Sequence, residues 1–150
     1  MALFYVDSSA LVKLVLSEPQ TAALTAFLDG ADLVSCELVL TEVPRAVRRA
    51  AAGDRRLPLD DLVGRAREVL DVLALLPLDR ALLMGAGALD EPALRALDAI
   101  HVTAAAGAGP VDAFVTYDER QSAAARLAGL RTVAPDARMR ETDRNDEGEG

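Results

Sequence analysis

Leu3-Phe4-Tyr5-Val6-Asp7 is a short apolar run of strand-forming residues that ends on an acid, and it is the strongest indication of the fold class. A second stretch, Ala113-Phe114-Val115-Thr116, has the same character and is soon followed by Asp118. Between the two, short apolar runs alternate with segments whose apolar residues recur at helical spacing. This alternation predicts an α/β domain with a mostly parallel sheet.

The expected elements follow from these patterns and from the residues that interrupt them. Strands are expected at residues 3–6, 33–35, 72–76, 113–116 and 131–133. Helices are expected at residues 9–16, 21–28, 41–52, 59–70, 80–88, 93–106 and 119–128. No linker divides the chain, so residues 1–138 are expected to form one domain. Residues 139–150 are polar, charged and without apolar anchors, which predicts a disordered acidic tail.

The composition excludes several classes of protein. With 150 residues, 51% of them hydrophobic, the chain is long and apolar enough to fold around one core. No apolar run reaches the roughly 18 residues that span a membrane, and the start of the chain lacks the basic segment of a secretory signal. Cys36 is the only cysteine, which excludes an intrachain disulfide and a zinc site of the Cys/His type. We therefore expect a cytoplasmic protein that does not associate with membranes.

The net charge of −8 argues at first against a nucleic-acid partner. Half of this charge, however, comes from residues 141–150, which hold five acids and one arginine. The other half equals the charge of four acids that stand where the sequence pattern changes, namely Asp7, Glu42, Asp98 and Asp118. With a cation bound to those four, the folded part would be near neutral. The charge therefore permits an RNA substrate without indicating one.

The four acids predict a divalent metal site. Asp7 and Asp118 follow expected strands, and open α/β folds form their ligand sites beyond the carboxyl ends of such strands. Glu42 and Asp98 belong to helical segments that can cover the same edge of the sheet. Four converging carboxylates repel one another unless a cation joins them, and Mg²⁺ prefers oxygen ligands of this kind. We expect Mg²⁺ or Mn²⁺ at this site.

Each acid also has a competing structural explanation. Asp7 and Asp118 can cap the helices that follow them. Glu42 in a first turn favours the helix dipole, with Thr41 as the expected cap of that helix. Asp98 is harder to explain, because helical spacing places it in an apolar stripe with Leu94 and Val102. A carboxylate there is costly unless it is paired or metal-bound. The structural alternative for this residue is a salt bridge to an arginine of another segment.

Four further residues lie near these acids in the expected fold. Thr116 points to the same side of its strand as the acid two positions later; it either holds a water or phosphate oxygen or is an ordinary strand residue. Arg45 and Arg49 share a helix face with Glu42. They either bind a phosphodiester or belong to a solvated face with one ion pair. His101, the only histidine, is expected to be a hydrogen-bonded core residue rather than a general base.

Taken in order, four segments resemble the acidic motifs of PIN-domain ribonucleases, especially VapC-type toxins of bacterial toxin–antitoxin pairs. The segments are Tyr5-Val6-Asp7-Ser8-Ser9-Ala10-Leu11-Val12-Lys13-Leu14, Leu40-Thr41-Glu42-Val43, Leu94-Arg95-Ala96-Leu97-Asp98-Ala99-Ile100-His101 and Val115-Thr116-Tyr117-Asp118-Glu119-Arg120. The resemblance covers residues 3–133, which is nearly all of the expected folded chain. Pro44, directly after the second segment, departs from the family pattern.

The resemblance implies a PIN-like fold, with a five-stranded parallel sheet flanked by helices, and endonucleolytic cleavage of RNA that depends on Mg²⁺ or Mn²⁺. It implies Asp7, Glu42, Asp98 and Asp118 as the acidic cluster, with Thr116 as an accessory residue. Asp7 and Asp98 are the expected direct ligands. The resemblance also implies a homodimer and inhibition by a cognate VapB-type antitoxin.

Two other functions are compatible with the residues alone. A phosphoacceptor signalling domain also has an acid pocket in an α/β fold, but it needs an acid beside Asp7 and a lysine after the last strand. A non-catalytic α/β binding module leaves Asp98 unexplained. Stabilisation by Mn²⁺ would distinguish a nuclease from the binding module, and RNA cleavage would distinguish it from the phosphoacceptor.

Overall fold

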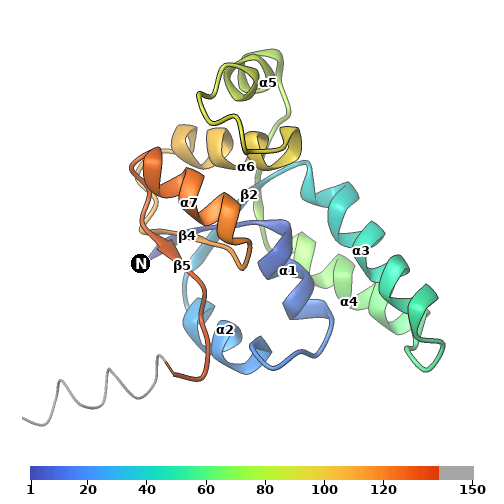
Figure 1. Ribbon diagram of the computed structural model, residues 1–150. Coiled ribbons are helices and arrows are strands. Elements are labelled where there is room, and N and C mark those ends of the chain that lie inside the picture. The colour runs from blue at the N-terminus through green and yellow to red at the C-terminus, as the bar shows by residue number, and fades with distance from the viewer. Residues whose placement is uncertain (139–150) are drawn as a thin grey trace, which may run out of the picture.

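The computed structural model describes residues 1–138, which form a five-stranded sheet with helices on both faces (Figure 1). The strands are β1 (Leu3–Val6), β2 (Asp32–Cys36), β3 (Ala74–Leu76), β4 (Ala113–Val115) and β5 (Thr132–Val133). Their order in the sheet is β3-β2-β1-β4-β5, and all neighbouring strands are parallel. The predicted α/β class with a five-stranded parallel sheet is confirmed.

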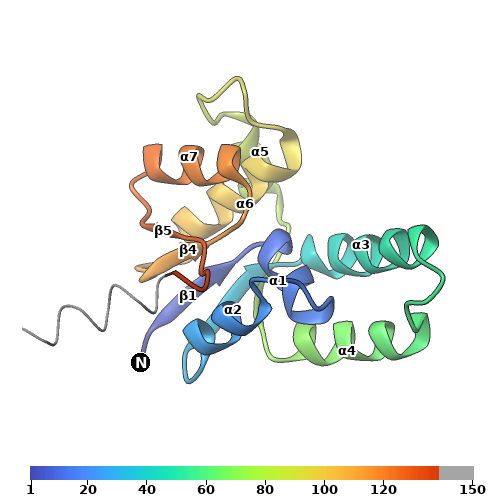
Figure 2. The same cartoon turned by 60° about the horizontal axis from the view of Figure 1, so that its bottom comes forward.

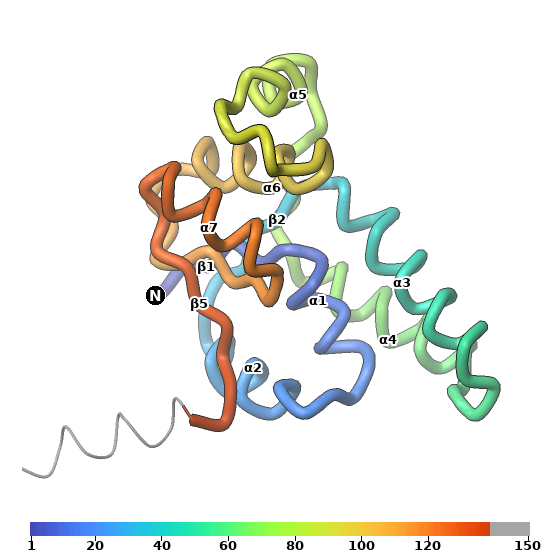
Figure 3. The backbone as a smooth tube through the Cα atoms, viewed as in Figure 1, coloured from blue at the N-terminus to red at the C-terminus, as the bar shows by residue number. Residues whose placement is uncertain are grey.

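The helices form a layer on each side of this sheet. They are α1 (Ser8–Val15), α2 (Thr21–Leu28), α3 (Val39–Gly53), α4 (Leu59–Asp71), α5 (Arg80–Gly87), α6 (Ala96–Gly107) and α7 (Glu119–Leu127). Figure 2 shows α1 to α4 on one side, and α6 and α7 on the other with α5 packed on α6. The backbone trace in Figure 3 shows α3 and α4 side by side as a helical hairpin that extends away from the sheet.

Alternating side chains of β1 divide the core in two. Phe4 and Val6 face α1 to α4, and the Phe4 ring stacks on Phe27 with the ring centroids 4.7 Å apart. Tyr5 faces α6 and α7 and stacks on Phe114 with the centroids 5.1 Å apart. Both faces of the sheet are therefore buried, which explains why β1 is a continuous apolar run rather than an alternating one.

Three helices begin at other residues than expected, and the first of them, α1, begins at Ser8 instead of residue 9. α3 begins at Val39 instead of residue 41, so Pro44 lies beyond the first turn of the helix rather than within it. Its buried side chains recur every four residues from Val39, and this packing extends the helix past the expected cap at Thr41. α6 begins at Ala96 instead of residue 93, because Pro92 belongs to a turn before the helix.

Among residues 1–138, no helix combines the length and the apolar character needed to cross a bilayer. The expected acidic tail at residues 139–150 lies outside the described residues. The end of the folded domain at residue 138 stays a prediction.

Candidate active site

The order of the strands places three of the expected site residues together. From β1 the chain proceeds to β2 and β3 on one side, and it then crosses to β4 and β5 on the other. Open parallel sheets bind ligands at such a switch in strand order, outside the carboxyl ends of the strands. Asp7 directly follows β1, and Thr116 and Asp118 follow its neighbour β4.

Asp7 is held by hydrogen bonds from both sides of this switch. Its side chain is 1% exposed. Oδ1 accepts from the Ser9 hydroxyl at 2.7 Å and from the Ala10 backbone N–H at 3.0 Å, so Asp7 is also the N-cap of α1. Oδ2 accepts from the Thr116 hydroxyl at 2.5 Å. Burial raises the pKa of Asp7, and the hydrogen bonds from Ser9 and Thr116 oppose this rise only in part.

Thr116 connects the carboxyl ends of β1 and β4. Its hydroxyl donates to Asp7 and also accepts from the Asp118 backbone N–H at 3.0 Å. Asp118 in turn accepts from the Gln121 N–H at 2.9 Å and caps α7. Thr116 therefore contacts the side chain of Asp7 and the backbone of Asp118, which is more than the packing role of an ordinary strand threonine.

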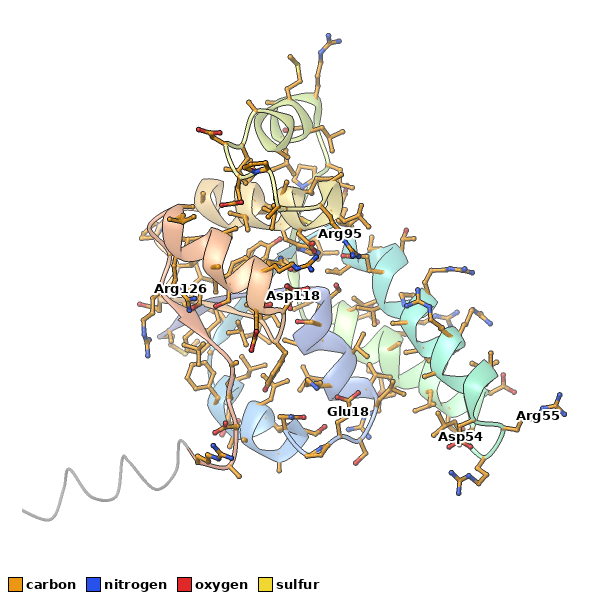
Figure 4. All side chains as sticks on the ribbon, viewed as in Figure 1. Glu18, Asp54, Arg55, Arg95, Asp118 and Arg126 are labelled. Carbon is orange, nitrogen blue, oxygen red and sulfur yellow. The ribbon has the colours of Figure 1, made fainter. Side chains whose placement is uncertain are left out.

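Asp98 lies half-buried in the first turn of α6. Burial raises its pKa, and the negative charges of Asp118 and Glu42 raise it further, against the opposing charges of His101 and Arg95. Since such interactions weaken with distance, Asp118 and Glu42 are close enough to Asp98 for their charges to act on it. The salt bridge considered as a structural explanation is not found for Asp98 among residues 1–138. Figure 4 shows Arg95 and Asp118 side by side, and both line the same pocket.

Glu42, half-buried in α3, is bound by His101. Glu42 Oε1 lies 2.6 Å from Nε2 of His101, whose side chain is 1% exposed. The other ring nitrogen, Nδ1, lies 2.9 Å from the Tyr5 hydroxyl and 3.7 Å from Cys36 Sγ. Burial by itself lowers the pKa of His101, but hydrogen bonds and charges from Cys36 and Glu42 outweigh burial and raise the pKa to about 10. His101 is a hydrogen-bonded core residue, as expected, and it also contacts a candidate site residue.

The donor atoms at this edge suit a hard divalent cation, although they are not drawn together around one point. The side chains offer carboxylate and hydroxyl oxygens, and the repulsion at Asp98 is of the kind that a cation relieves. Within the described part of the chain, however, no three His, Cys, Asp or Glu side chains are arranged to hold an ion. That Asp7 and Asp98 share an ion stays a prediction.

Basic side chains flank the acids in two pockets. They are Lys13, Arg45, Arg49, Arg95 and Arg120. The first pocket, of about 570 Å³, lies beside Glu42 and contains the expected pair Arg45 and Arg49. The second, of about 450 Å³, contains Asp98, and Tyr117 lines both pockets. A larger pocket of about 690 Å³, between α1, α2 and α4, contains none of the four acids.

Sequence patterns missed several residues that complete this site. Ser9 donates its hydroxyl to Asp7 and accepts the Tyr117 N–H at 2.9 Å, which adds a second link between the two strand ends. Its position two residues after Asp7 was a signal, but the same position suits helix capping. Arg95 and Arg120 had no signal, because exposed arginines occur on any helical surface.

Comparison with known proteins agrees with the fold and with the position of the acids. The family model described as PIN domain matches residues 4–144, and the chain belongs to this family. The resemblance seen in the acidic motifs is thereby confirmed.

Curated relatives narrow the family further, to the VapC ribonucleases. "Ribonuclease VapC47" of Mycobacterium tuberculosis is 37% identical over 141 residues, which is 90% of this chain and 98% of the relative. "Ribonuclease VapC35" of the same species is 37% identical over 139 residues, with 89% and 97% covered.

Two solved structures share the fold at low sequence identity. PAE2754 from Pyrobaculum aerophilum has a TM-score of 0.63 at 21% identity and covers 88% of this chain and 84% of its own. VapBC2 from Rickettsia felis, bound to a DNA fragment from their promoter, has a TM-score of 0.64 at 13% identity. That match covers 89% of this chain and 99% of the other.

Proposed function

We propose that this protein is an endoribonuclease, the toxin of a type II toxin–antitoxin pair, and that it hydrolyses RNA phosphodiesters with Mg²⁺ or Mn²⁺. One observation carries the proposal. Asp7, Thr116 and Asp118 form a hydrogen-bonded group where the strand order switches, and Asp98 is near enough to Asp118 and Glu42 for their charges to raise its pKa. The relatives named as ribonucleases support this reaction, and membership in their family argues against a phosphoacceptor or a non-catalytic binding module.

The residues of the site have different tasks in this reaction. Asp7 and Asp98 would hold the cation, with Glu42 and Asp118 beside them. When bound, such an ion neutralises the carboxylates and lowers the pKa of water toward neutrality. Thr116 would hold the orientation of the Asp7 carboxylate through its 2.5 Å hydrogen bond.

The basic pockets would bind the RNA backbone on either side of the acids. Arg45 and Arg49 are exposed in the pocket beside Glu42, where guanidinium groups can pair with phosphate oxygens. Arg95 and Arg120 line the other pocket, which contains Asp98, and can pair with phosphate oxygens there in the same way. A strand that crosses the site would therefore meet positive charge before and after the scissile phosphate. This arrangement lets a chain of net charge −8 bind RNA.

We also propose a VapB-type antitoxin partner, a homodimer and a cytoplasmic location. The solved VapBC2 structure with the same fold supports the choice of partner. An arginine from the antitoxin can pair with the carboxylates of the site and exclude the cation. Expression of the protein alone should inhibit growth, and co-expression with its neighbouring antitoxin gene should restore growth. Growth inhibition that persists with the antitoxin present would contradict this part of the proposal.

The decisive test is RNA cleavage by purified Asp7→Asn and Asp98→Asn variants with Mg²⁺ or Mn²⁺ present. Asparagine keeps the shape of each side chain and the capping bond of Asp7, but it removes the charge. We expect each variant to lose activity by about 100-fold or more. Asp71→Asn is the matched control, because Asp71 is exposed and ends α4 close to the opposite edge of the sheet. Cleavage by either site variant at the rate of this control would overturn the assignment.

A further inference from the structure

A chain of polar side chains runs from the acidic site into the core. Glu42 Oε1 contacts His101 Nε2 at 2.6 Å, and His101 Nδ1 contacts the Tyr5 hydroxyl at 2.9 Å. His101 and Tyr5 are 1% and 0% exposed. Both ring nitrogens of His101 therefore have partners, and neither partner is water.

In this row of hydrogen-bonded side chains, the inner end at Tyr5 and His101 is held rigidly by the core. The Tyr5 ring stacks on Phe114 with an interplanar angle of 11°, and it meets the His101 ring edge-on with the centroids 6.0 Å apart. Tyr5 is also part of β1, the central strand of the sheet. A rotation of the His101 ring would break both of its hydrogen bonds inside the core, where an unpaired polar group is costly. His101 is therefore a fixed support.

Glu42, at the outer end of this row of side chains, needs such a support. Glu42 comes from α3, while the acid that it must approach, Asp98, comes from α6. The two carboxylates repel each other, as the effect of Glu42 on the pKa of Asp98 shows. Without a restraint, a half-buried glutamate with three rotatable bonds would turn toward solvent and away from Asp98. His101 lies one helical turn after Asp98, so α6 supplies one acid and the group that holds the other.

We propose that His101 is a positioning residue that holds the Glu42 carboxylate at the cation site, with Tyr5 as its anchor. The inference rests on the proposed metal-dependent nuclease. The inference goes beyond that function because it gives the buried histidine a task in the reaction. His101 acts through Glu42 and without contact to the RNA. Glutamine at position 101 should perform this task, because its side-chain amide nitrogen can take the place of Nε2. Asparagine should not, because its amide nitrogen takes the place of Nδ1 and does not reach Glu42.

The experiment compares His101→Gln with His101→Asn in the full-length protein. Two readouts are measured: Mn²⁺ affinity, from the rise of the unfolding temperature with Mn²⁺ concentration, and kcat and KM for RNA cleavage. We expect His101→Asn to lose roughly ten- to a hundredfold in Mn²⁺ affinity and in kcat, as is typical when the partner of a ligand is removed, with KM for RNA little changed. His101→Gln keeps the bond to Glu42 and loses only the bond to Tyr5, so its losses should be clearly smaller than those of His101→Asn, about threefold. Equal losses in the two variants would overturn the proposal, since a packing role does not distinguish them in this way.

A double-mutant cycle with Glu42→Gln shows whether the effect passes through Glu42. If His101 acts by holding that carboxylate, His101→Asn should cause no further loss of Mn²⁺ affinity in the Glu42→Gln background. An equal loss in both backgrounds would overturn the proposal. Tyr5→Phe removes only the anchoring hydroxyl while it keeps the stacked ring, so it should lower Mn²⁺ affinity in the same direction as His101→Asn. An unchanged affinity in Tyr5→Phe would contradict the role of the anchor.

The two readouts also separate this inference from the proposed function. If the parent protein binds Mn²⁺ in a His101-dependent way but does not cleave RNA, the positioning role stands and the nuclease function fails. If the parent protein cleaves RNA and both position-101 variants do so at its rate, the function stands and the positioning role fails.

Discussion

At the scale of single residues, the acids of the site have structural and functional tasks at once. Asp7 caps α1 and Asp118 caps α7, as their structural explanations required. Asp79 caps α5 with the same geometry, accepting from the Leu82 N–H at 2.8 Å, although it lies in none of the acidic motifs. Capping therefore neither supports nor excludes a role in catalysis. What distinguishes Asp7 is its second oxygen, which is bound by a hydroxyl from a neighbouring strand end.

Asp98 has no capping bond and no ion pair among the described residues, so its charge should destabilise the metal-free fold. We expect Asp98→Asn to raise the free energy of unfolding by about 0.5–1 kcal/mol, since the repulsion from Asp118 and Glu42 is screened by solvent at this half-exposed site. Urea unfolding in the presence of a chelator measures the change. A less stable variant would mean that the Asp98 carboxylate makes a favourable contact in the folded state.

The same repulsion predicts a dependence of stability on pH. The pKa of Asp98 is raised above 3.8, its ordinary value in the unfolded chain. At a pH between 3.8 and the raised pKa of the folded state, Asp98 is protonated in the folded state but ionised in the unfolded chain. The contribution of Asp98 to stability therefore grows as the pH falls and is lost as the pH rises. The gain in stability from Asp98→Asn should therefore be larger at about pH 7 than at about pH 4. Unfolding curves of the parent and variant at both pH values test this, and a gain that is larger at the lower pH would contradict it.

At the scale of elements, α3 shows how packing overrides local signals. Its N-cap position is Leu38, whose side chain cannot accept a hydrogen bond, while the expected cap, Thr41, lies inside the helix. Pro44 lacks the N–H that would reach the Leu40 carbonyl. The helix forms nevertheless, because Val39, Val43 and Val47 are fully buried along one stripe.

Replacing Pro44 by alanine should therefore stabilise the protein. Alanine restores the missing helical hydrogen bond and removes the clash of the proline ring with the preceding turn, so we expect a gain of about 1–3 kcal/mol in the free energy of unfolding. Thermal or urea unfolding measures it. Glu42 is held by His101 rather than by the proline, so RNA cleavage should stay at the level of the parent protein. A variant that is more stable but inactive would show that the proline shapes the position of Glu42.

At the scale of the whole molecule, the strand order creates the site. With β1 in the centre, the residues after β1 and β4 meet at the sheet edge, and the helices on the two faces bring Glu42 and Asp98 from opposite layers. The site thus lies between two layers that are fixed by separate cores. A cation that binds there would connect both layers.

Divalent metal should therefore stabilise the protein as a whole. Mn²⁺ at about 100 times its dissociation constant should add about 2.7 kcal/mol to the free energy of unfolding by mass action, and a chelator should reverse the effect. The shift of the unfolding temperature with added Mn²⁺ provides the measurement. This shift should be nearly absent in Asp98→Asn and as large as in the parent protein in the control Asp71→Asn. An equal shift in both variants would place the bound metal elsewhere on the molecule.

Much of this organisation was predictable because it is local. The apolar runs that end at Val6 and Val115 define strands through the residues next to them, and the acids that follow these runs must then lie at the carboxyl edge of a parallel sheet. The class of fold and the edge that carries the site followed from such patterns. The start of α3 did not, because the burial of Val39 depends on a layer formed by other segments.

An α/β sheet with acids after its strands was thus predictable from local patterns, since periodicity and strand-ending residues depend only on near neighbours. The way in which those acids are held depends on contacts between distant segments. The bond from Thr116 to Asp7 joins residues 109 positions apart, and the bond from His101 to Glu42 joins residues 59 positions apart. Such contacts arise from the order of the strands and the packing of the helix layers, and no local pattern of residues specifies them.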